Sequence, residues 1–303
     1  MKTHQRTIKD AITMRGIGLH SGKNIELRLL PADPGQGVTF VRVDLPGKPE
    51  IPALTENVVD TRLATTLAFQ GVKVSTVEHL MAALYGLGVD NMRVEISGAE
   101  VPIFDGSSAP FVEAIEAIGT LSQTSVRPVL VLNKRIEIKV GSSWVIAEPS
   151  SHLEVHSSVE FDHPSVGKQE FIFDESQHSF KEIANARTFC FYKDVEKMKE
   201  LGLIQGGSLD NAVVFNDDGV LNPEGLRHSD ELVRHKVLDA LGDFKLSGFE
   251  LQAKIRVHRG GHEINSRLIQ AILEKSENFK LIEENSESSY SEEEVFSSQP
   301  VFA

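Results

Sequence analysis

The stretch RHKVLDALGD, residues 234–243, decides how the rest of the chain is interpreted. At about 100° per residue, its apolar side chains fall on one side of a helix. His235, Asp239 and Asp243 are spaced by four residues and form a polar stripe away from that side. A His and an Asp one turn apart emerge roughly 5–6 Å from each other, which suits a shared metal ion. Taken alone, the stripe is more typical of a solvated polar face.

A second stretch, EHLMAALYG at residues 78–86, matches the first. Aligning it with residues 234–242 places His79 on His235, with a glycine seven residues later in both stretches. A strand and a further helix are expected after each. We therefore predict an internal duplication, in which two domains of similar build face each other. Each domain would bring a helix-borne His to the crevice between them, which is a usual place for a ligand site.

The predicted fold class is α+β, with two similar two-layer α/β sandwich domains and the active site at their interface. Residues 1–124 are expected to form the N-terminal domain and residues 125–280 the C-terminal domain. Residues 190–215 combine an amphipathic helix, glycines and an apolar strand, which predicts a β-α-β insert in the second domain. Residues 281–303 are rich in Ser and Glu, and we expect a disordered acidic tail. Helices are predicted over residues 75–86, 111–118, 180–186, 194–202, 230–242 and 263–274.

Composition narrows the function classes. The chain has 303 residues and a net charge of −13, of which six glutamates after residue 282 supply nearly half. The remaining mild acidity argues against nucleic-acid binding, but not against a local pocket for phosphate. No apolar run reaches the ~20 residues that span a bilayer, and a signal peptide is lacking, so we expect a cytoplasmic protein without stable membrane insertion. Its one cysteine, Cys190, excludes an intrachain disulfide and a cysteine-based zinc site.

The two matched stretches together supply a complete set of metal ligands. His79 from one domain would join His235 and Asp239 from the other. Catalytic zinc sites keep three protein ligands and a fourth position for water, which ionises near pH ~7 and serves hydrolysis. Glu78 is a candidate general base, although its spacing from Ser75 forms a capping box and by itself favours a capping role.

His262 follows two glycines at the start of the last predicted helix. A carboxylate such as Asp243 could hold it as a general acid. A surface His at a helix start is the more ordinary interpretation of this position alone.

In their order along the chain, the motifs resemble the UDP-3-O-acyl-N-acetylglucosamine deacetylase family, the zinc enzymes of the committed step of lipid A synthesis in Gram-negative bacteria. The resemblance runs from Gln5 to about Leu273. Each motif alone is weak evidence for the family, but the whole set in this order is very specific to it. The motifs are GIGLHSG (16–22), STVEH (75–79), PIFDGSSAP (102–110), ARTF (186–189), GGSLDNA (206–212), RHKVLD (234–239) and GH (261–262).

The resemblance implies a role for each catalytic candidate. It assigns the zinc to the His79, His235 and Asp239 set, and it reverses the capping interpretation by making Glu78 the general base. The other roles fall on three residues. His262 would be the general acid and bind charge near the phosphates, Asp243 would orient it, and Thr188 would stabilise the tetrahedral oxyanion.

The resemblance also implies substrate contacts. Phe189 resembles a residue that lines the sugar site. Lys236 and Arg259 stand where the family has basic residues near the diphosphate; Arg259 replaces a frequent Lys, and either charge would serve. Phe161 and His163 lie in a segment that resembles the nucleotide-binding part.

The insert resembles the β-α-β unit that forms an apolar passage for the acyl chain. Gly207, within the 206–212 motif, is counted among the substrate-binding residues. The alternative is that the insert only packs against the body, and this alternative stays open for each of its side chains.

The implied activity is zinc-dependent hydrolysis of the N-acetyl group of UDP-3-O-acyl-N-acetylglucosamine, giving UDP-3-O-acyl-glucosamine and acetate. Ferrous iron is an alternative metal in the cell. Two other functions stay open, a non-haem iron oxygenase, which also uses two His and a carboxylate, and a non-catalytic sugar-nucleotide-binding regulator. Helix-borne ligands beside Glu78 favour hydrolysis, and the complete residue set argues against lost catalysis. In the tail we expect a site where a regulatory protease starts degradation.

Overall fold

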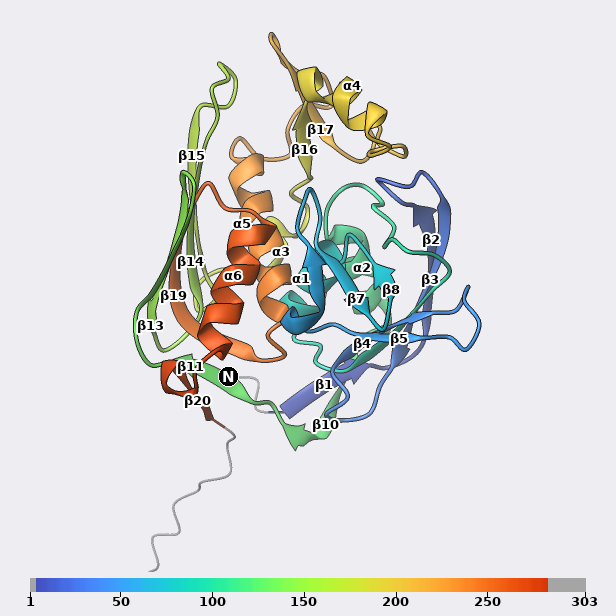
Figure 1. Ribbon diagram of the computed structural model, residues 1–303, viewed down its shortest axis with the longest axis vertical. Coiled ribbons are helices and arrows are strands. Elements are labelled where there is room, and N and C mark those ends of the chain that lie inside the picture. Colours follow the sequence, from blue (N-terminus) through green and yellow to red (C-terminus); the bar gives the residue numbers. More distant parts are fainter. Residues whose placement is uncertain (1–3, 283–303) are drawn as a thin grey trace, which may run out of the picture.

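The computed structural model describes residues 4–282, and its centre is a layer of helices between two β-sheets (Figure 1). Helices α1 (Glu78–Leu87), α5 (Glu231–Lys245) and α6 (His262–Leu273) lie in this layer. The α+β class expected from the sequence is confirmed, whereas the internal duplication and the domain boundaries stay predictions. Within the described residues, no helix is both long and apolar enough to cross a bilayer. The disordered tail is predicted to begin at residue 281, but residues 281 and 282 belong to strand β20 (Phe279–Ile282), so this start is wrong. Residues 283–303 lie outside the described residues.

The first large sheet has the strand order β2-β3-β9-β4-β5. Its strands are β2 (Ile12–Ile17), β3 (Asn24–Pro31), β4 (Val38–Arg42), β5 (Glu50–Pro52) and β9 (Met92–Ile96). Alternate residues of β3 belong to the main hydrophobic core, as the period of two predicts. Smaller pairings flank it: β1 (His4–Ile8) with β10 (Thr120–Val126), and β6 (Val58–Asp60), β7 (Thr66–Phe69) and β8 (Val72–Val74) with one another.

The second large sheet is built around β19 (Glu250–His258), which pairs in parallel with β11 and β14 and antiparallel with β13. Helices α5 and α6 pack against this sheet. Its other strands are β11 (Val129–Leu132), β12 (Ile136–Val140), β13 (Ser143–Pro149), β14 (Glu154–Glu160), β15 (Lys168–Asp174) and β20 (Phe279–Ile282). Two further helices, α2 (Ala109–Ile118) and α3 (Lys181–Ala184), and the 3-10 turns Thr55–Asn57 and Ser276–Asn278 complete the body.

Helices α1 and α5 cross at close range, and this crossing creates the site. A Cβ on Gly242 would lie 2.1 Å from the carbonyl oxygen of Glu78, so only glycine allows the approach. The crossing buries the polar stripe of α5: Asp239 and Asp243 are 2% and 3% exposed. The solvated face that the stretch favours by itself is therefore wrong, because α1 covers that face.

The β-α-β insert is present as β16 (Phe189–Phe191), α4 (Tyr192–Glu200) and β17 (Val213–Asn216), with β16 and β17 parallel. Strand β18 (Gly219–Val220) extends the sheet. Figure 1 shows this unit projecting from one end of the molecule. A separate apolar cluster anchors it, formed by Val166, Val213, Phe215 and Leu232.

The capping box expected at Ser75 and Glu78 is wrong. Thr76 adopts φ 58°, so the chain turns sharply before the helix, and α1 begins at Glu78 without a side-chain cap. Ser75 Oγ donates to the carbonyl of Ala99 at 3.1 Å instead. The Glu78 carboxylate is thereby left available for the site.

Candidate active site and metal centre

One atom from each predicted metal ligand meets where α1 crosses α5. His235 Nε2 and His79 Nε2 lie 3.3 Å and 3.7 Å from Asp239 Oδ1, and the three potential ligand atoms all lie within 4.8 Å of one another. All three residues are buried. Two elements from opposite halves of the chain thus place two imidazoles and a carboxylate around one point, as the sequence predicts.

The donors in this cluster fit a divalent metal ion. Asp239 Oδ1 is buried and has no hydrogen-bond partner within the part of the chain that the structure describes, which is costly unless a cation faces it. His235 Nδ1 donates to the carbonyl oxygen of Ala186 at 3.0 Å, so that Nε2 carries the lone pair that a metal needs. Burial lowers the pKa of His79 to about 3, and the neighbouring His235 adds to this, so His79 is in its neutral, ligating form. Two nitrogen ligands and one carboxylate are typical of catalytic zinc.

Glu78 and His262 face each other beside the metal ligands. Glu78 Oε1 lies 3.8 Å from His262 Nε2, beyond hydrogen-bond distance. Burial raises the pKa of Glu78 to about 7, although His262 opposes the shift. Burial would lower the pKa of His262, but the carboxylates of Asp243 and Glu78 outweigh it and raise this pKa to about 9. The pair thus holds a proton acceptor and a proton donor in one buried space.

Asp243 contacts His262, and two side chains that the sequence did not single out also contact Asp243. That Asp243 orients a general acid stays a prediction. His262 Nδ1 donates to Asp243 Oδ2 at 2.9 Å. Thr65 Oγ1 donates to Asp243 Oδ1 at 2.6 Å, and Asn265 Nδ2 donates to Asp243 Oδ2 at 2.9 Å. The backbone N–H of Thr65 also donates to Glu78 Oε2 at 3.0 Å. Thr65 therefore donates hydrogen bonds to Asp243 and to Glu78 at once.

The segment after α3 brings Thr188 and Phe189 to the site. The backbone N–H of Thr188 donates to the carbonyl of Gly106 at 2.8 Å, and the Phe189 ring lies 6.4 Å from that of His235. Both residues and Gly207 line a cavity of about 320 Å³ beside α4, whose lining is largely apolar. This cavity has the character expected of the acyl passage.

Lys236 lies at the edge of the same site. Its Nζ is 3.0 Å from Asp239 Oδ2 and 5.4 Å from the centre of the Phe189 ring. Because Oδ2 is held by Lys236, Oδ1 is the oxygen left for a metal.

The remaining predicted substrate contacts are more distant or differently engaged. The Phe161 ring packs edge-on against Phe189 at 5.5 Å. His163 lies further along, where its Nε2 is 2.7 Å from the carbonyl of Asn216. Arg259 has φ 51° in the turn before α6, and its guanidinium lies 3.3 Å from Glu160. The nucleotide and diphosphate roles of these residues stay predictions.

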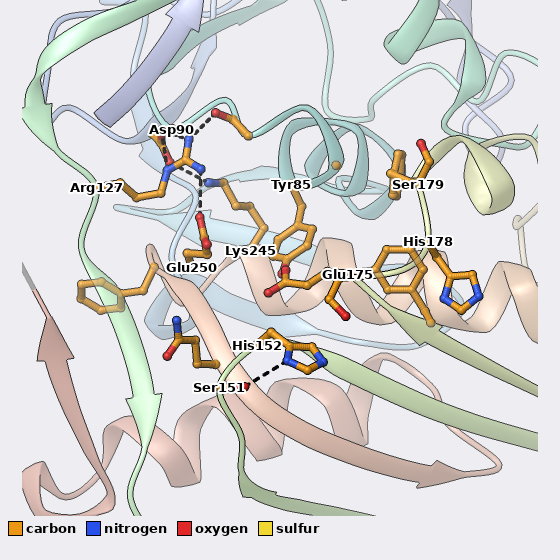
Figure 2. Close-up of a pocket in the computed structure, with 17 residues that line it drawn as sticks. Tyr85, Asp90, Arg127, Ser151, His152, Glu175, His178, Ser179, Lys245 and Glu250 are labelled. Carbon is orange, nitrogen blue, oxygen red and sulfur yellow. Dashed lines mark hydrogen bonds and ion pairs between the residues drawn. The ribbon is translucent and has the colours of Figure 1, made fainter. Parts of the chain in front are cut away.

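A second, larger cavity of about 570 Å³ lies at the C-terminal ends of α1 and α5 (Figure 2). Tyr85 and Lys245 line it together with a buried ion-pair cluster centred on Arg127. Arg127 bonds to Asp90 and Glu250, at 3.0 Å from Nε and 2.9 Å from Nη1. Each charged group of this cluster has a hydrogen-bond partner, whereas Asp239 Oδ1 has none among the described residues.

Comparison with known proteins agrees with the geometry. The family model described as LpxC, UDP-3-O-acyl N-acetylglycosamine deacetylase, matches residues 5–274. The UDP-3-O-acyl-N-acetylglucosamine deacetylase of Myxococcus xanthus is 45% identical over 280 residues, which cover 92% of this chain and 89% of the relative. The enzyme of that name from a Geobacter species is 47% identical, and the match covers 92% of this chain and 92% of the relative. The enzyme from Chromobacterium violaceum is 44% identical, and the match covers 90% of this chain and 91% of the relative. The chain belongs to the UDP-3-O-acyl-N-acetylglucosamine deacetylase family.

Proposed function

We propose that this chain hydrolyses the N-acetyl group of UDP-3-O-acyl-N-acetylglucosamine, the step to which its family belongs in lipid A synthesis. The products are UDP-3-O-acyl-glucosamine and acetate. The observation that carries this proposal is the buried Glu78–His262 pair beside the two imidazoles and the carboxylate of Asp239. An amide hydrolase needs a base for water, an acid for the leaving amine and a cation for the oxyanion, and this site offers a place for each.

The metal would be held by His79, His235 and Asp239, and we propose zinc. When bound, zinc supplies Lewis acidity, which stabilises negative charge that develops on oxygen. Ferrous iron would fit the same donors. Metal analysis after anaerobic purification distinguishes the two, and an oxygen-consumption assay tests the oxygenase alternative. The proton acceptor–donor pair of Glu78 and His262 favours hydrolysis over that alternative, because an oxygenase has no use for it.

The proton transfers fall on Glu78 and His262. A carboxylate with a pKa raised to about 7 accepts a proton from the attacking water near neutral pH. The protonated His262 imidazole, with its pKa raised to about 9, donates a proton to the amine nitrogen as the C–N bond breaks. Asp243 keeps that imidazole oriented through Nδ1 and stabilises its charge. The reaction thus uses one water, and acetate and a free amine leave.

Substrate binding follows from the surfaces around this centre. We propose that Thr188 supports the oxyanion and that Phe189 lines the sugar site. The acyl chain would occupy the apolar cavity beside α4, which Gly207 also lines. Lys236 and Arg259 would face the diphosphate, and Phe161 and His163 the nucleotide. For Lys236 this requires the ammonium to divide its interactions between the substrate and Asp239.

Replacing the general base tests the proposal most directly. Glu78→Ala should keep its metal, because Glu78 is not a ligand, and should lower the rate of acetate release by about 10²–10⁴-fold. Glu263→Ala is the matched control, since Glu263 is exposed on α6 and pairs only with Arg267. Metal content and acetate release are measured on both variants. Full activity of Glu78→Ala would reject the assigned role.

Three wider proposals concern the whole chain. We propose that residues 1–124 and 125–280 are duplicated α+β units, and that the protein works in the cytoplasm. We also propose that the acidic segment from residue 283, which lies outside the described residues, is where a regulatory protease begins degradation. Deleting residues 284–303 should lengthen the half-life in cells, and an unchanged half-life would reject the last point.

A further inference from the structure

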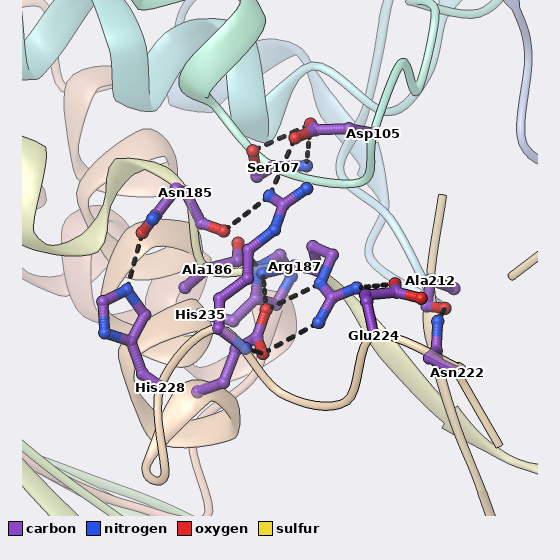
Figure 3. Close-up of polar contacts among 12 residues, drawn as sticks. Asp105, Ser107, Asn185, Ala186, Arg187, Ala212, Asn222, Glu224, His228 and His235 are labelled. Carbon is purple, nitrogen blue, oxygen red and sulfur yellow. Dashed lines mark hydrogen bonds and ion pairs between the residues drawn. The ribbon is translucent and has the colours of Figure 1, made fainter. Parts of the chain in front are cut away.

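The peptide bond between Ala186 and Arg187 is held on both sides by side chains of α5 (Figure 3). Its carbonyl oxygen accepts from His235 Nδ1 at 3.0 Å, and its N–H donates to Glu231 Oε1 at 3.0 Å. Glu231 and His235 are four residues apart on α5, so they lie one turn apart on the same face. A single peptide unit therefore connects a carboxylate to a predicted metal ligand.

Glu231 is unusually well enclosed for a carboxylate. It is 0% exposed, and Arg187, its charge partner, is 2% exposed. The guanidinium donates to both carboxylate oxygens, from Nε at 2.9 Å and from Nη2 at 3.2 Å. The backbone N–H of Arg227 donates to Glu231 Oε2 at 2.7 Å. Burial opposes ionisation, but these hydrogen bonds outweigh it and lower the pKa of Glu231, so the group is charged.

Further hydrogen bonds from Arg187 and Arg227 hold the chain segments around this peptide. Arg187 Nη2 donates to the carbonyl of Gly225 at 2.7 Å, and Nη1 pairs with Glu224. Arg227 Nη1 bonds to Asp105 Oδ2 at 2.8 Å and to the carbonyl of Asn185 at 2.9 Å. The peptide unit thus has little freedom to rotate away from either α5 side chain.

We propose that Glu231 is a positioning residue for the metal centre, which it reaches through the 186–187 peptide and His235. Metal-bound imidazoles usually donate their second N–H to a carboxylate or a carbonyl, and this partner fixes the ring and strengthens the ligand. Here the carbonyl belongs to a peptide whose N–H is bonded to a buried anion. Hydrogen bonds in such a chain polarise one another. The Glu231 charge therefore makes the Ala186 oxygen a better acceptor and His235 Nε2 a better donor to the metal.

The competing explanation is that Glu231 only stabilises the fold around Arg187. A variant of Glu224 distinguishes this explanation from our proposal. Glu224 pairs with the same guanidinium but is 55% exposed and does not touch the 186–187 peptide. Loss of Glu224 removes a charge partner of Arg187 and leaves the connection to His235 intact. Loss of the Glu231 charge weakens the connection itself.

The inference rests on the metal site of the proposed function, so the test measures metal binding without substrate. Wild type, Glu231→Gln and Glu224→Gln are stripped of metal, and their Zn²⁺ affinity is measured by competition with a chromogenic chelator. Glu231→Gln keeps an acceptor oxygen but loses the charge, and its affinity should fall about 10–100-fold, as for other residues that support metal ligands. Glu224→Gln should stay within about twofold of wild type, and the Co²⁺ absorption spectrum should change in Glu231→Gln alone.

Two further variants keep the test decisive. Arg187→Lys leaves the carboxylate charged and its bond to the peptide N–H in place, so it should unfold at a lower temperature yet retain the metal affinity of wild type. If Glu231→Gln does not fold, Glu231→Asp replaces it, because the shorter side chain keeps the charge but withdraws from the peptide; it should lose affinity in the same range. Wild-type affinity in the Glu231 variant, or equal losses in Glu231 and Arg187 variants, would overturn the inference. Failure of wild type to bind zinc would instead reject the proposed function.

Discussion

Two polar clusters lie along helices α1 and α5, one where the helices cross and one at their C-terminal ends, and they differ in one respect. At the C-terminal ends of the helices, every charge of the Arg127 cluster has a protein partner, including Lys245, whose Nζ lies 3.5 Å from Asp90 (Figure 2). At the metal centre, Asp239 Oδ1 has no hydrogen-bond partner among residues 4–282. Glu78 Oε1 and His262 Nε2 lie 3.8 Å apart, which is too far for a hydrogen bond.

This difference separates a structural cluster from a functional one. A buried charge that is paired and hydrogen-bonded is compatible with a stable fold, whereas an unpaired one is costly. The chain therefore accepts a cost at the centre, which a bound cation would relieve, and avoids it around Arg127. The comparison makes predictions that separate stability from metal binding.

The largest effect is expected from removing Asp239. Asp239→Ala deletes one of three ligands, so Zn²⁺ affinity should fall by more than the about 100-fold that supporting residues cost, and acetate release should become undetectable. The fold of the metal-free protein should survive, since a buried oxygen that has no hydrogen-bond partner among residues 4–282 disappears with the side chain. Metal content and circular dichroism measure the two parts. A variant that retains stoichiometric zinc would contradict the ligand assignment.

At the Arg127 cluster we expect the opposite result, a loss of stability without a loss of zinc. Arg127→Met removes a buried guanidinium and leaves the partly buried Asp90 and Glu250 without their main partner. The free energy of unfolding should fall by up to the about 3–5 kcal/mol that breaking a buried pair costs. Zinc content and activity of the folded protein should match wild type. Arg28→Met is the control, because its ion pair with Glu95 is half exposed and worth about 1 kcal/mol or less. Urea unfolding gives both values; a loss of zinc in Arg127→Met would show that the clusters are not separate.

A smaller effect on activity is expected from Thr65. Thr65→Val removes the hydroxyl that donates to Asp243 but keeps the N–H that donates to Glu78. A hydrogen bond to a charged group contributes about 1.5–3 kcal/mol, so kcat should fall roughly 10–100-fold while KM and zinc content stay constant. Thr66→Val, one residue along in β7, serves as the control. An unchanged kcat, or a change confined to KM, would remove Thr65 from the catalytic support.

The sequence could indicate site residues that lie one helical turn apart or that recur in two matching stretches. His235 and Asp239 lie one helical turn apart, so helix geometry alone brings these two together. His79 lies on another helix, and only the match between the two stretches indicated it. Thr65 and Asp243 are 178 positions apart, and Thr65 lies in irregular chain, where no period indicates a partner. Asn265 follows His262 by three residues on α6, and this spacing weakly indicates that the two side chains share a face of the helix. Glu231 had no such signal, because the side chain and N–H of Arg187, which it contacts, lie 44 positions away in the chain.

Where the pattern misled, tertiary packing was the reason. Amphipathicity predicts which face of a helix is apolar, but not that a second helix covers the polar face of α5. The capping box at Ser75 failed because a residue with φ 58° intervenes. In both places a local rule gives way at a functional site, as expected where a chain holds groups for chemistry rather than stability.

The smallest predicted effect is the coupling between the two clusters. Within residues 4–282 they share no hydrogen-bond partner: Arg127 bonds to Asp90, Glu250 and the Gly88 carbonyl, and none of these touches a metal ligand. Zinc at 100 times its dissociation constant should stabilise wild type by about 2.7 kcal/mol. Arg127→Met should gain the same increment within about 0.5 kcal/mol, because independent sites contribute additively. Urea unfolding of both proteins with and without zinc measures this cycle. A coupling well above 0.5 kcal/mol would mean that α1 and α5 transmit strain between their clusters, and that the paired charges around Arg127 help to set the metal site after all.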